Sequence, residues 1–122
     1  MTDFTLIIEK TIREKIYTIR GQKVMLDFDA AYLYEVDLKI LRQAVARNKK
    51  RFPPDFQVQL TDNEWAELKS RLALSSSFPV QKVPPMAFAE GGLLMLSGVL
   101  KSKKAVDVGI AIINALFSVN RR

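Results

Sequence analysis

The fold is decided by two consecutive segments, Asp29-Ala-Ala-Tyr-Leu-Tyr-Glu-Val36 and Asp37-Leu-Lys-Ile-Leu-Arg-Gln-Ala-Val-Ala-Arg-Asn-Lys-Lys-Arg51. In the first segment, apolar residues recur at helical spacing, which predicts a short helix over residues 30–35: Ala30, Leu33 and Tyr34. Asp27 or Asp29 is expected to cap this helix.

The second segment predicts a longer helix. Asp37 is expected to cap it, and it runs to about Arg51, where Pro53-Pro54 ends it. A short helix, a brief turn and a longer helix match the helix-turn-helix plan, with helix 38–51 as the recognition helix.

The positive charge of the chain is concentrated in this second helix. The 122 residues include 19 Lys and Arg and 13 Asp and Glu, so the formal net charge is +6. No acidic residue lies between Leu38 and Pro54, and six basic residues there supply a charge equal to that total: Lys39, Arg42, Arg47, Lys49, Lys50 and Arg51. A neutral body with one basic segment favours a localised contact with a polyanion.

The two sides of the expected helix differ in chemistry. Leu38, Leu41 and Val45 share a side that is expected to face the core together with Phe52. The opposite side is basic, and the residues predicted to contact DNA are Lys39, Arg42, Gln43, Arg47, Lys50 and Arg51. Arg42 and Gln43 are the candidate base readers because both side chains can hydrogen-bond a base edge in a bidentate manner, while the lysines and Arg47 are expected on phosphates. The alternative is a solvated helix face whose charges only confer solubility.

The rest of the chain alternates between short strands and helices. Ile16–Arg20 and Lys23–Leu26 flank Gly21-Gln22, which predicts a hairpin with a type II′ turn. A strand is expected over 56–60, a capping box of Thr61 and Glu64 opens a further helix, and a short strand around 86–88 precedes helices near 90–100 and 102–119. This order predicts an α+β fold with one DNA-binding domain over residues 12–119, an extension over 1–11 and a tail over 120–122.

Two further surfaces are weaker candidates. Arg20 and Lys23 on the hairpin are expected to add phosphate contacts, although acidic residues nearby favour a merely solvated hairpin. The last helix carries apolar residues on more than one side, and one stripe is a candidate homodimer interface: Val108, Ile112, Leu116 and Val119. Burial inside the domain is the alternative, and a protein-interaction module without DNA contact is the competing function.

Several classes of function are disfavoured by composition. The chain has no Cys and no His, so neither thiol chemistry nor an imidazole-based triad or zinc site is available. No phosphate-binding loop or nucleophile motif is present, so we expect no enzymatic activity, no metal or other cofactor and no small-molecule substrate. The longest apolar runs, 91–100 and 108–119, are shorter than the roughly 20 residues that span a bilayer. Because the acidic N-terminus does not resemble a signal peptide, a cytoplasmic location is expected.

The sequence also resembles the ORF-six N-terminal domain family, which is grouped with the KilA-N and Bro-N domains of phage antirepressors. The resemblance covers about residues 12–117 and rests on ordered motifs: Ile16-Tyr-Thr-Ile-Arg-Gly21, Val24-Met-Leu-Asp27, Leu33-Tyr34, Arg47-Asn48, Arg51-Phe-Pro53, Asp55-Phe56, Gln59-Leu-Thr61, Glu64, Ala87-Phe88, Glu90, Met95-Leu-Ser97 and Val99-Leu100. It implies a DNA-binding module of a bacterial or phage-encoded transcription regulator, acting as repressor or antirepressor, without enzymatic activity.

Three positions depart from the family pattern. Glu35 replaces a Gly between the two helices, so either a positive φ is kept at a cost of roughly 1 kcal/mol or the turn shifts. Arg42 replaces an expected Asn, which adds charge to the outward side, and Ala30 replaces a Leu in the first helix.

Overall fold

A computed structural model describes residues 10–72, 83–100 and 103–117 of the chain. A helical turn over residues 10–14 leads into a hairpin of strands β1 (Ile16–Ile19) and β2 (Gln22–Leu26). Helices α2 (Asp27–Tyr34) and α3 (Leu38–Arg47) follow, and then a single 3-10 turn, η1 (Lys49–Arg51). The remaining elements are β3 (Gln57–Gln59), α4 (Asp62–Leu72), β4 (Met86–Phe88), α5 (Glu90–Val99) and α6 (Lys103–Phe117).

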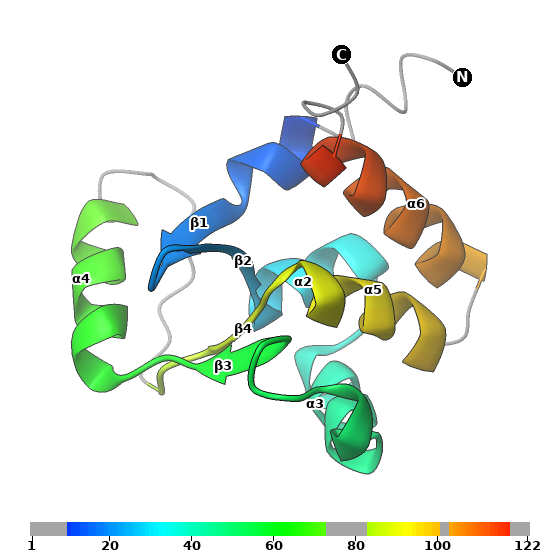
Figure 1. Ribbon diagram of the computed structural model, residues 1–122, viewed down its shortest axis with the longest axis horizontal. Helices are drawn as coiled ribbons and strands as arrows, with labels where there is room; N and C mark the ends of the chain where they lie inside the picture. Colours follow the sequence, from blue (N-terminus) through cyan, green and yellow to red (C-terminus); the bar gives the residue numbers. More distant parts are fainter. Residues whose placement is uncertain (1–9, 73–82, 101–102, 118–122) are drawn as a thin grey trace.

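The four strands form one antiparallel sheet in the order β1-β2-β4-β3. Helix α4 lies on one side of this sheet, and helices α2, α3, α5 and α6 gather on the other side (Figure 1). The α+β fold expected from the sequence is therefore confirmed.

Alternation along the strands supplies a core for each face of the sheet. Met25 and Phe88 are buried among the apolar side chains of α2, α3, α5 and α6. Their neighbours Val24, Leu26 and Ala87 point to the other face, where they pack with Trp65 and Leu68 of α4. A strand turns successive side chains to opposite faces, so three residues of β2 are enough to join both cores.

The starts of α4 and α5 are confirmed as the sequence predicts them. At the start of α4, the Thr61 backbone N–H donates to a Glu64 carboxylate oxygen at 2.8 Å, and the Glu64 N–H donates to the Thr61 hydroxyl oxygen at 3.1 Å. This reciprocal pair is the capping box. Helix α5 starts at Glu90 as expected, after the short strand β4.

Two local predictions are wrong. The hairpin turn centres on Arg20 and Gly21, with φ of 53° and 78°, so Gly21 occupies the second central position of a type I′ turn. Positive φ at both positions gives a backbone twist that matches the strands. Neither Asp27 nor Asp29 caps α2, because the helix already begins at Asp27 with Leu26 at the N-cap position, and both carboxylates are buried.

The turn between α2 and α3 keeps the left-handed conformation. Glu35 has φ 59° and ψ 45°, and the N–H of Val36 donates to the Ala31 carbonyl at 3.0 Å while the N–H of Glu35 donates to the Tyr32 carbonyl at 3.2 Å. These two bonds form a Schellman motif, which usually has Gly at the left-handed position.

We expect the substitution Glu35→Gly to stabilise the domain by up to about 1 kcal/mol, because Gly adopts a positive φ without steric cost. Chemical denaturation of both proteins measures the difference. Glu35→Ala is the control, since it also removes the 3.1 Å ion pair with Lys104 but keeps the Cβ atom. Equal stability of the Gly and Ala variants would contradict the strain at this turn.

Candidate nucleic-acid interface

The outward side of α3 and the turn η1 carry most of the cations predicted to contact DNA. Leu41, Ala44 and Val45 of α3 are buried against the core, and Phe52 anchors the segment that follows. The opposite side is exposed and, with η1, forms what we call the basic surface: Lys39, Gln43, Arg47, Lys49, Lys50 and Arg51. Among the residues that the structure describes, no carboxylate forms an ion pair with the five cations of this surface.

The predicted single helix over 38–51 is wrong in its second part. Helix α3 ends at Arg47, and Asn48 adopts φ −118° and ψ 39° while its side-chain amide donates to the Ala44 carbonyl at 2.8 Å. Asn48 thereby occupies a carbonyl at the helix end, and the chain continues as a 3-10 turn. Lys50 and Arg51 therefore lie next to the end of α3 instead of in helical register with Lys39.

Arg42, one of the two candidate base readers, has a partner inside the domain. Its guanidinium Nε and Nη2 lie 3.3 and 3.1 Å from Oδ2 of Asp27, which also accepts a hydrogen bond from the backbone N–H of Met86 at 3.2 Å. The Asp27 side chain is fully buried, whereas Arg42 remains 42% exposed. Burial raises the pKa of Asp27, while the Met86 N–H and Arg42 oppose that rise. Arg42 thus ties α3 to the first turn of α2.

Asp29 is the second buried carboxylate of α2. Burial raises its pKa to about 6, and the Lys15 ammonium, 3.5 Å away, lowers it less than burial raises it, while the neighbouring charge of Asp27 adds a small further rise. The folded state therefore binds more protons than the unfolded state between about pH 4 and pH 6, and stability falls as the pH rises through this window.

We expect Asp29→Asn to gain stability relative to the wild type between pH 4 and pH 7, by up to about 3 kcal/mol, because the amide cannot ionise. Denaturant titrations at several pH values measure the difference. Lys15→Met is the opposite control. It removes the ammonium that lowers the pKa of Asp29, so stability should decrease with rising pH more steeply than in the wild type. If the difference in unfolding free energy between Asp29→Asn and wild type is the same from pH 4 to pH 7, the pKa of Asp29 is not raised in the folded state.

The two hairpin cations that are predicted to contact phosphates, Arg20 and Lys23, lie in different surroundings. Arg20 is held by Glu64, with Nε–Oε2 and Nη2–Oε1 distances of 2.8 and 2.9 Å, so this predicted phosphate contact is engaged in binding α4. The same hydrogen bonds lower the pKa of Glu64 to about 2. Lys23 is exposed on β2. No local sequence pattern indicates the Arg20 pairing, because its partner lies 44 residues away in the chain.

The proposed dimer stripe on α6 is largely unavailable. Val108 and Ile112 are buried in the core against α2 and α5, which corrects their assignment to an exposed interface. The Leu116 side chain and Val119 lie outside the described residues. Two other apolar residues of α6 are exposed, Val106 at 52% and Ile110 at 54%.

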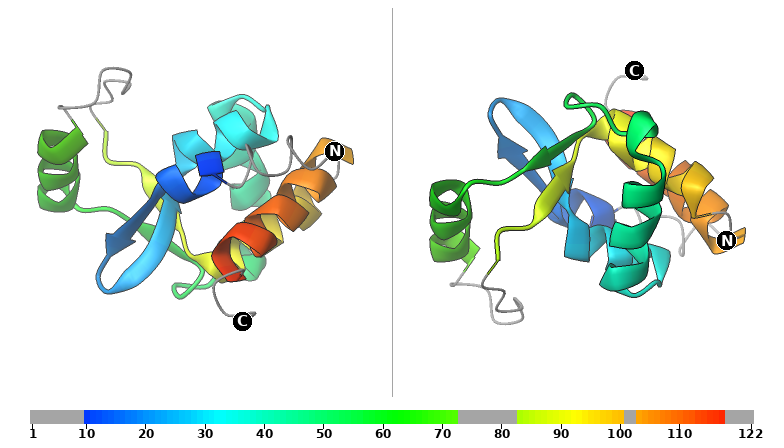
Figure 2. Two further views of the ribbon diagram at one scale, coloured as in Figure 1. Left: turned by 90° about the horizontal axis from the view of Figure 1, so that it is seen from above. Right: turned by 90° about the horizontal axis from the view of Figure 1, so that it is seen from below.

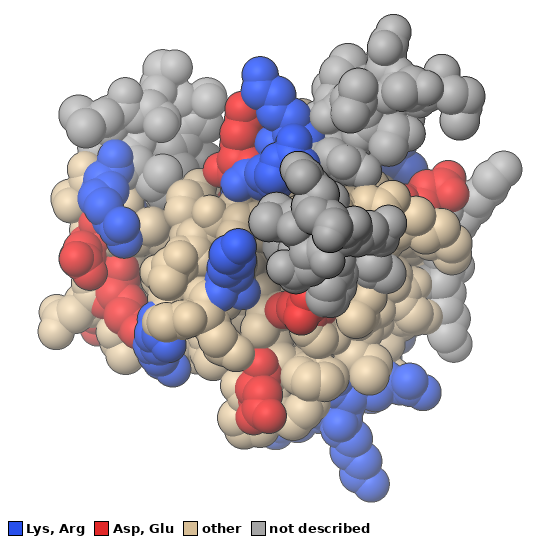
Figure 3. All heavy atoms as spheres, turned by 45° about the horizontal axis from the view of Figure 1, so that its top comes forward, with Lys and Arg blue, Asp and Glu red and all other residues tan. Residues whose placement is uncertain are grey.

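Charges of both signs are mixed on another face of the molecule. Figure 3 shows basic and acidic side chains interspersed among uncharged surface on the face drawn there. Helix α3 is in front when the molecule is viewed from below, with no other element covering it (Figure 2, right). The basic surface is thus free to meet a large partner.

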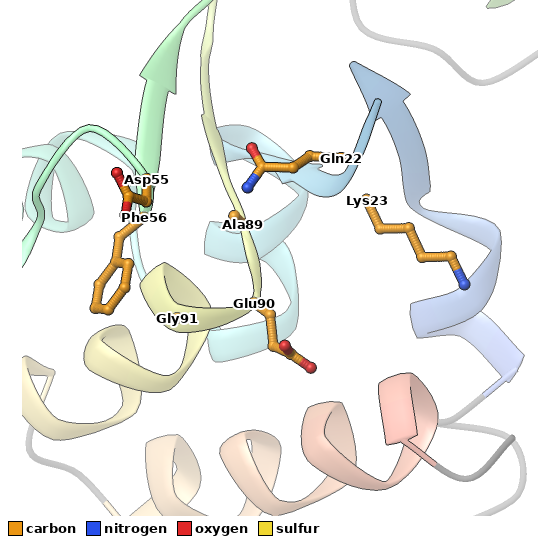
Figure 4. A pocket seen from close by; sticks show the side chains of 7 residues that line it. All are labelled: Gln22, Lys23, Asp55, Phe56, Ala89, Glu90 and Gly91. Carbon is orange, nitrogen blue, oxygen red and sulfur yellow. The ribbon is translucent and has the colours of Figure 1, made fainter. Parts of the chain in front are cut away.

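A hollow lies near the start of α5. It is lined by Gln22, Lys23, Asp55, Phe56, Ala89, Glu90 and Gly91. The carboxylates of Asp55 and Glu90 stand on different sides of it and do not point toward each other (Figure 4). The described residues contain no group of three or more side chains placed to hold a metal ion, and no helix among them is long and apolar enough to cross a membrane.

The geometry defines an α+β domain in which a short turn joins α2 to α3, and α3 together with the 3-10 turn η1 carries the basic surface. The family model of the ORF6N domain matches residues 14–99, more than half of the chain, and the protein belongs to this family. At the level of the family, membership suggests a DNA-binding regulator of the phage type. No curated protein and no solved structure matches the chain. Helix α6 lies beyond the matched residues, although it contributes to the same core.

Proposed function

We propose that this domain binds double-stranded DNA through the basic surface, sequence-specifically or semi-specifically, as part of a transcription regulator that acts as repressor or antirepressor. The observation that carries the proposal is that the five cations of the basic surface are exposed and pair with no carboxylate among the described residues, in a segment without any carboxylate from Leu38 to Pro54. The proposal includes no enzymatic step and no cofactor, and it places the protein in the cytoplasm.

The roles of the residues follow from their positions. Gln43 lies near the centre of the exposed side of α3, where an amide can bond both N6 and N7 of adenine in the major groove. Lys39, Arg47, Lys50 and Arg51 surround it and supply phosphate contacts that fix the register. Arg42 is a base reader only if it leaves Asp27, so in this proposal it orients α3.

A salt titration tests DNA binding itself. With four phosphate contacts, log K should fall linearly with log salt with a slope of about −3.6 for a mixed-sequence duplex. Fluorescence anisotropy between 50 and 300 mM salt measures the slope. An affinity that does not change with salt, or no binding at 50 mM, would overturn the proposal.

A second candidate function is a protein-interaction module that uses α6. Val106 and Ile110 favour it, since they lie one helical turn apart and are both about half exposed. Ile110→Asp should then shift a dimer to monomer in a sizing measurement without unfolding it, while Ile112→Asp should unfold the chain. A domain can bind DNA and self-associate at the same time. Self-association therefore favours this second function over the first only if the wild-type protein does not bind DNA.

A further inference from the structure

Ile40 is a large aliphatic side chain on the mostly polar exposed side of α3. It is 47% exposed, and within the fully described helix α3 it is the one large apolar side chain that is exposed to this degree. Single apolar residues on a surface are common and need no explanation. The residues beside Ile40 on the surface of α3 suggest a function for it that its exposure alone does not.

Helical spacing places Ile40 in one row with Gln43 and Arg47, at i, i+3 and i+7. We call these three residues the outward row. Ile40 and Gln43 belong to the first two turns of α3, and N-terminal residues of a recognition helix are the ones that reach base edges. Arg47 ends the helix beside the cations of η1.

The chemistry of the outward row fits one kind of base pair. The C5-methyl of thymine is an apolar group that the major groove presents at A·T pairs, and adenine offers the N6 donor and N7 acceptor that match a glutamine amide. Within the first two turns, the guanidinium that would favour guanine, that of Arg42, is held by the buried Asp27 at 3.1 Å. The first two turns therefore offer an aliphatic group and an amide at their exposed centre.

We infer that Ile40 contacts a thymine methyl group while Gln43 bonds an adenine of the same or the adjacent base pair, so that the domain prefers A·T pairs at a fixed place in its site. This inference rests on the proposed function. It adds a specificity-determining residue that basic charge alone does not reveal, since phosphate contacts carry no sequence information.

The test removes the methyl group from the DNA. Duplexes are first selected by the wild-type protein from a random pool, and the best sites are then remade with uracil in place of each thymine in turn. Loss of one buried methyl should weaken wild-type binding about fourfold at one position. Ile40→Ala should bind the thymine and uracil versions of that site equally.

The control is Leu94→Ala, which shortens a partly exposed aliphatic side chain on α5 and should keep the fourfold discrimination. Thermal unfolding checks that both variants are folded. If wild type binds the selected sites but no uracil position weakens binding by twofold, or if Ile40→Ala keeps the discrimination, the inference is wrong while the proposed function stands. If wild type retains no duplex from the pool, the proposed function fails and the inference fails with it.

Discussion

Gly92→Ala should destabilise the domain by about 3 kcal/mol or more, beyond the usual range for overpacking a core. A Cβ atom at residue 92 would overlap with the backbone carbonyl oxygen of Phe56. That carbonyl cannot easily withdraw, because it accepts a hydrogen bond from the Ala89 N–H at 2.9 Å, just before α5 begins. Urea denaturation followed by tryptophan fluorescence measures the loss.

Two other glycines of α5 provide matched controls. At Gly91 the added Cβ would meet the Phe56 ring at 2.6 Å, and because a side chain can rotate away, the loss should be smaller. At exposed Gly98 nothing lies within 4 Å, so Gly98→Ala should stabilise by up to about 1 kcal/mol through helix propensity. A Gly92→Ala variant as stable as the Gly91→Ala variant would contradict this close approach of α5 to Phe56.

Arg42→Ala should cost about 2 kcal/mol or more at pH 8, because it leaves the buried Asp27 carboxylate without its cation. The loss should shrink toward pH 4.5. Without Arg42 the pKa of Asp27, already raised by burial, rises further, so the folded state takes up a proton that the unfolded state does not bind, and stability recovers as the pH falls. Denaturant titrations at both pH values measure this effect.

Lys39→Ala is the matched control for Arg42→Ala, since it removes an exposed cation of the same helix that has no carboxylate partner among the described residues. It should change stability by less than about 0.5 kcal/mol at either pH. The double variant Asp27→Asn/Arg42→Ala should be less sensitive to pH than Arg42→Ala alone. An Arg42→Ala loss that is equal at pH 4.5 and pH 8 would show that the ion pair does not stabilise the fold.

Local patterns in the sequence predict much of this fold because they depend on neighbouring residues only. The capping box of Thr61 and Glu64 and the alternating residues 56–60, which contain β3, are complete within a few residues. The end of α3 is harder to predict, since Lys49, Lys50 and Arg51 all have good helix propensity. Asn48 decides it by bonding the Ala44 carbonyl, and an asparagine inside a helical pattern is only a weak signal to stop.

The candidate site was predictable in its position and not in its pairings. Charge counting identifies the segment that carries the basic surface, yet it treats Arg42 and Arg20 as free cations. Both are bound by carboxylates distant in sequence, Arg42 by Asp27 and Arg20 by Glu64. Such pairings depend on how α2, α3 and α4 pack, which periodicity does not specify. The position of Asp27 predicts a helix cap instead of a partner for Arg42, because an acidic residue before a helix usually caps it.

The central claim is that DNA meets the basic surface, and two charge-matched double variants test it most directly. Arg47→Ala/Lys50→Ala removes two cations from this surface, and Lys10→Ala/Arg13→Ala removes two from the helical turn at the opposite end of the molecule (Figure 1). Both variants lower the net charge by the same amount.

We predict that at 0.1 M salt Arg47→Ala/Lys50→Ala binds a mixed-sequence duplex roughly 50- to 100-fold more weakly than wild type, with the salt slope reduced from about −3.6 to about −1.8. Lys10→Ala/Arg13→Ala should bind within about threefold of wild type, with an unchanged slope, because distant charges are screened. Equal losses in the two double variants would contradict the claim, since binding would then follow net charge and not the surface formed by α3 and η1.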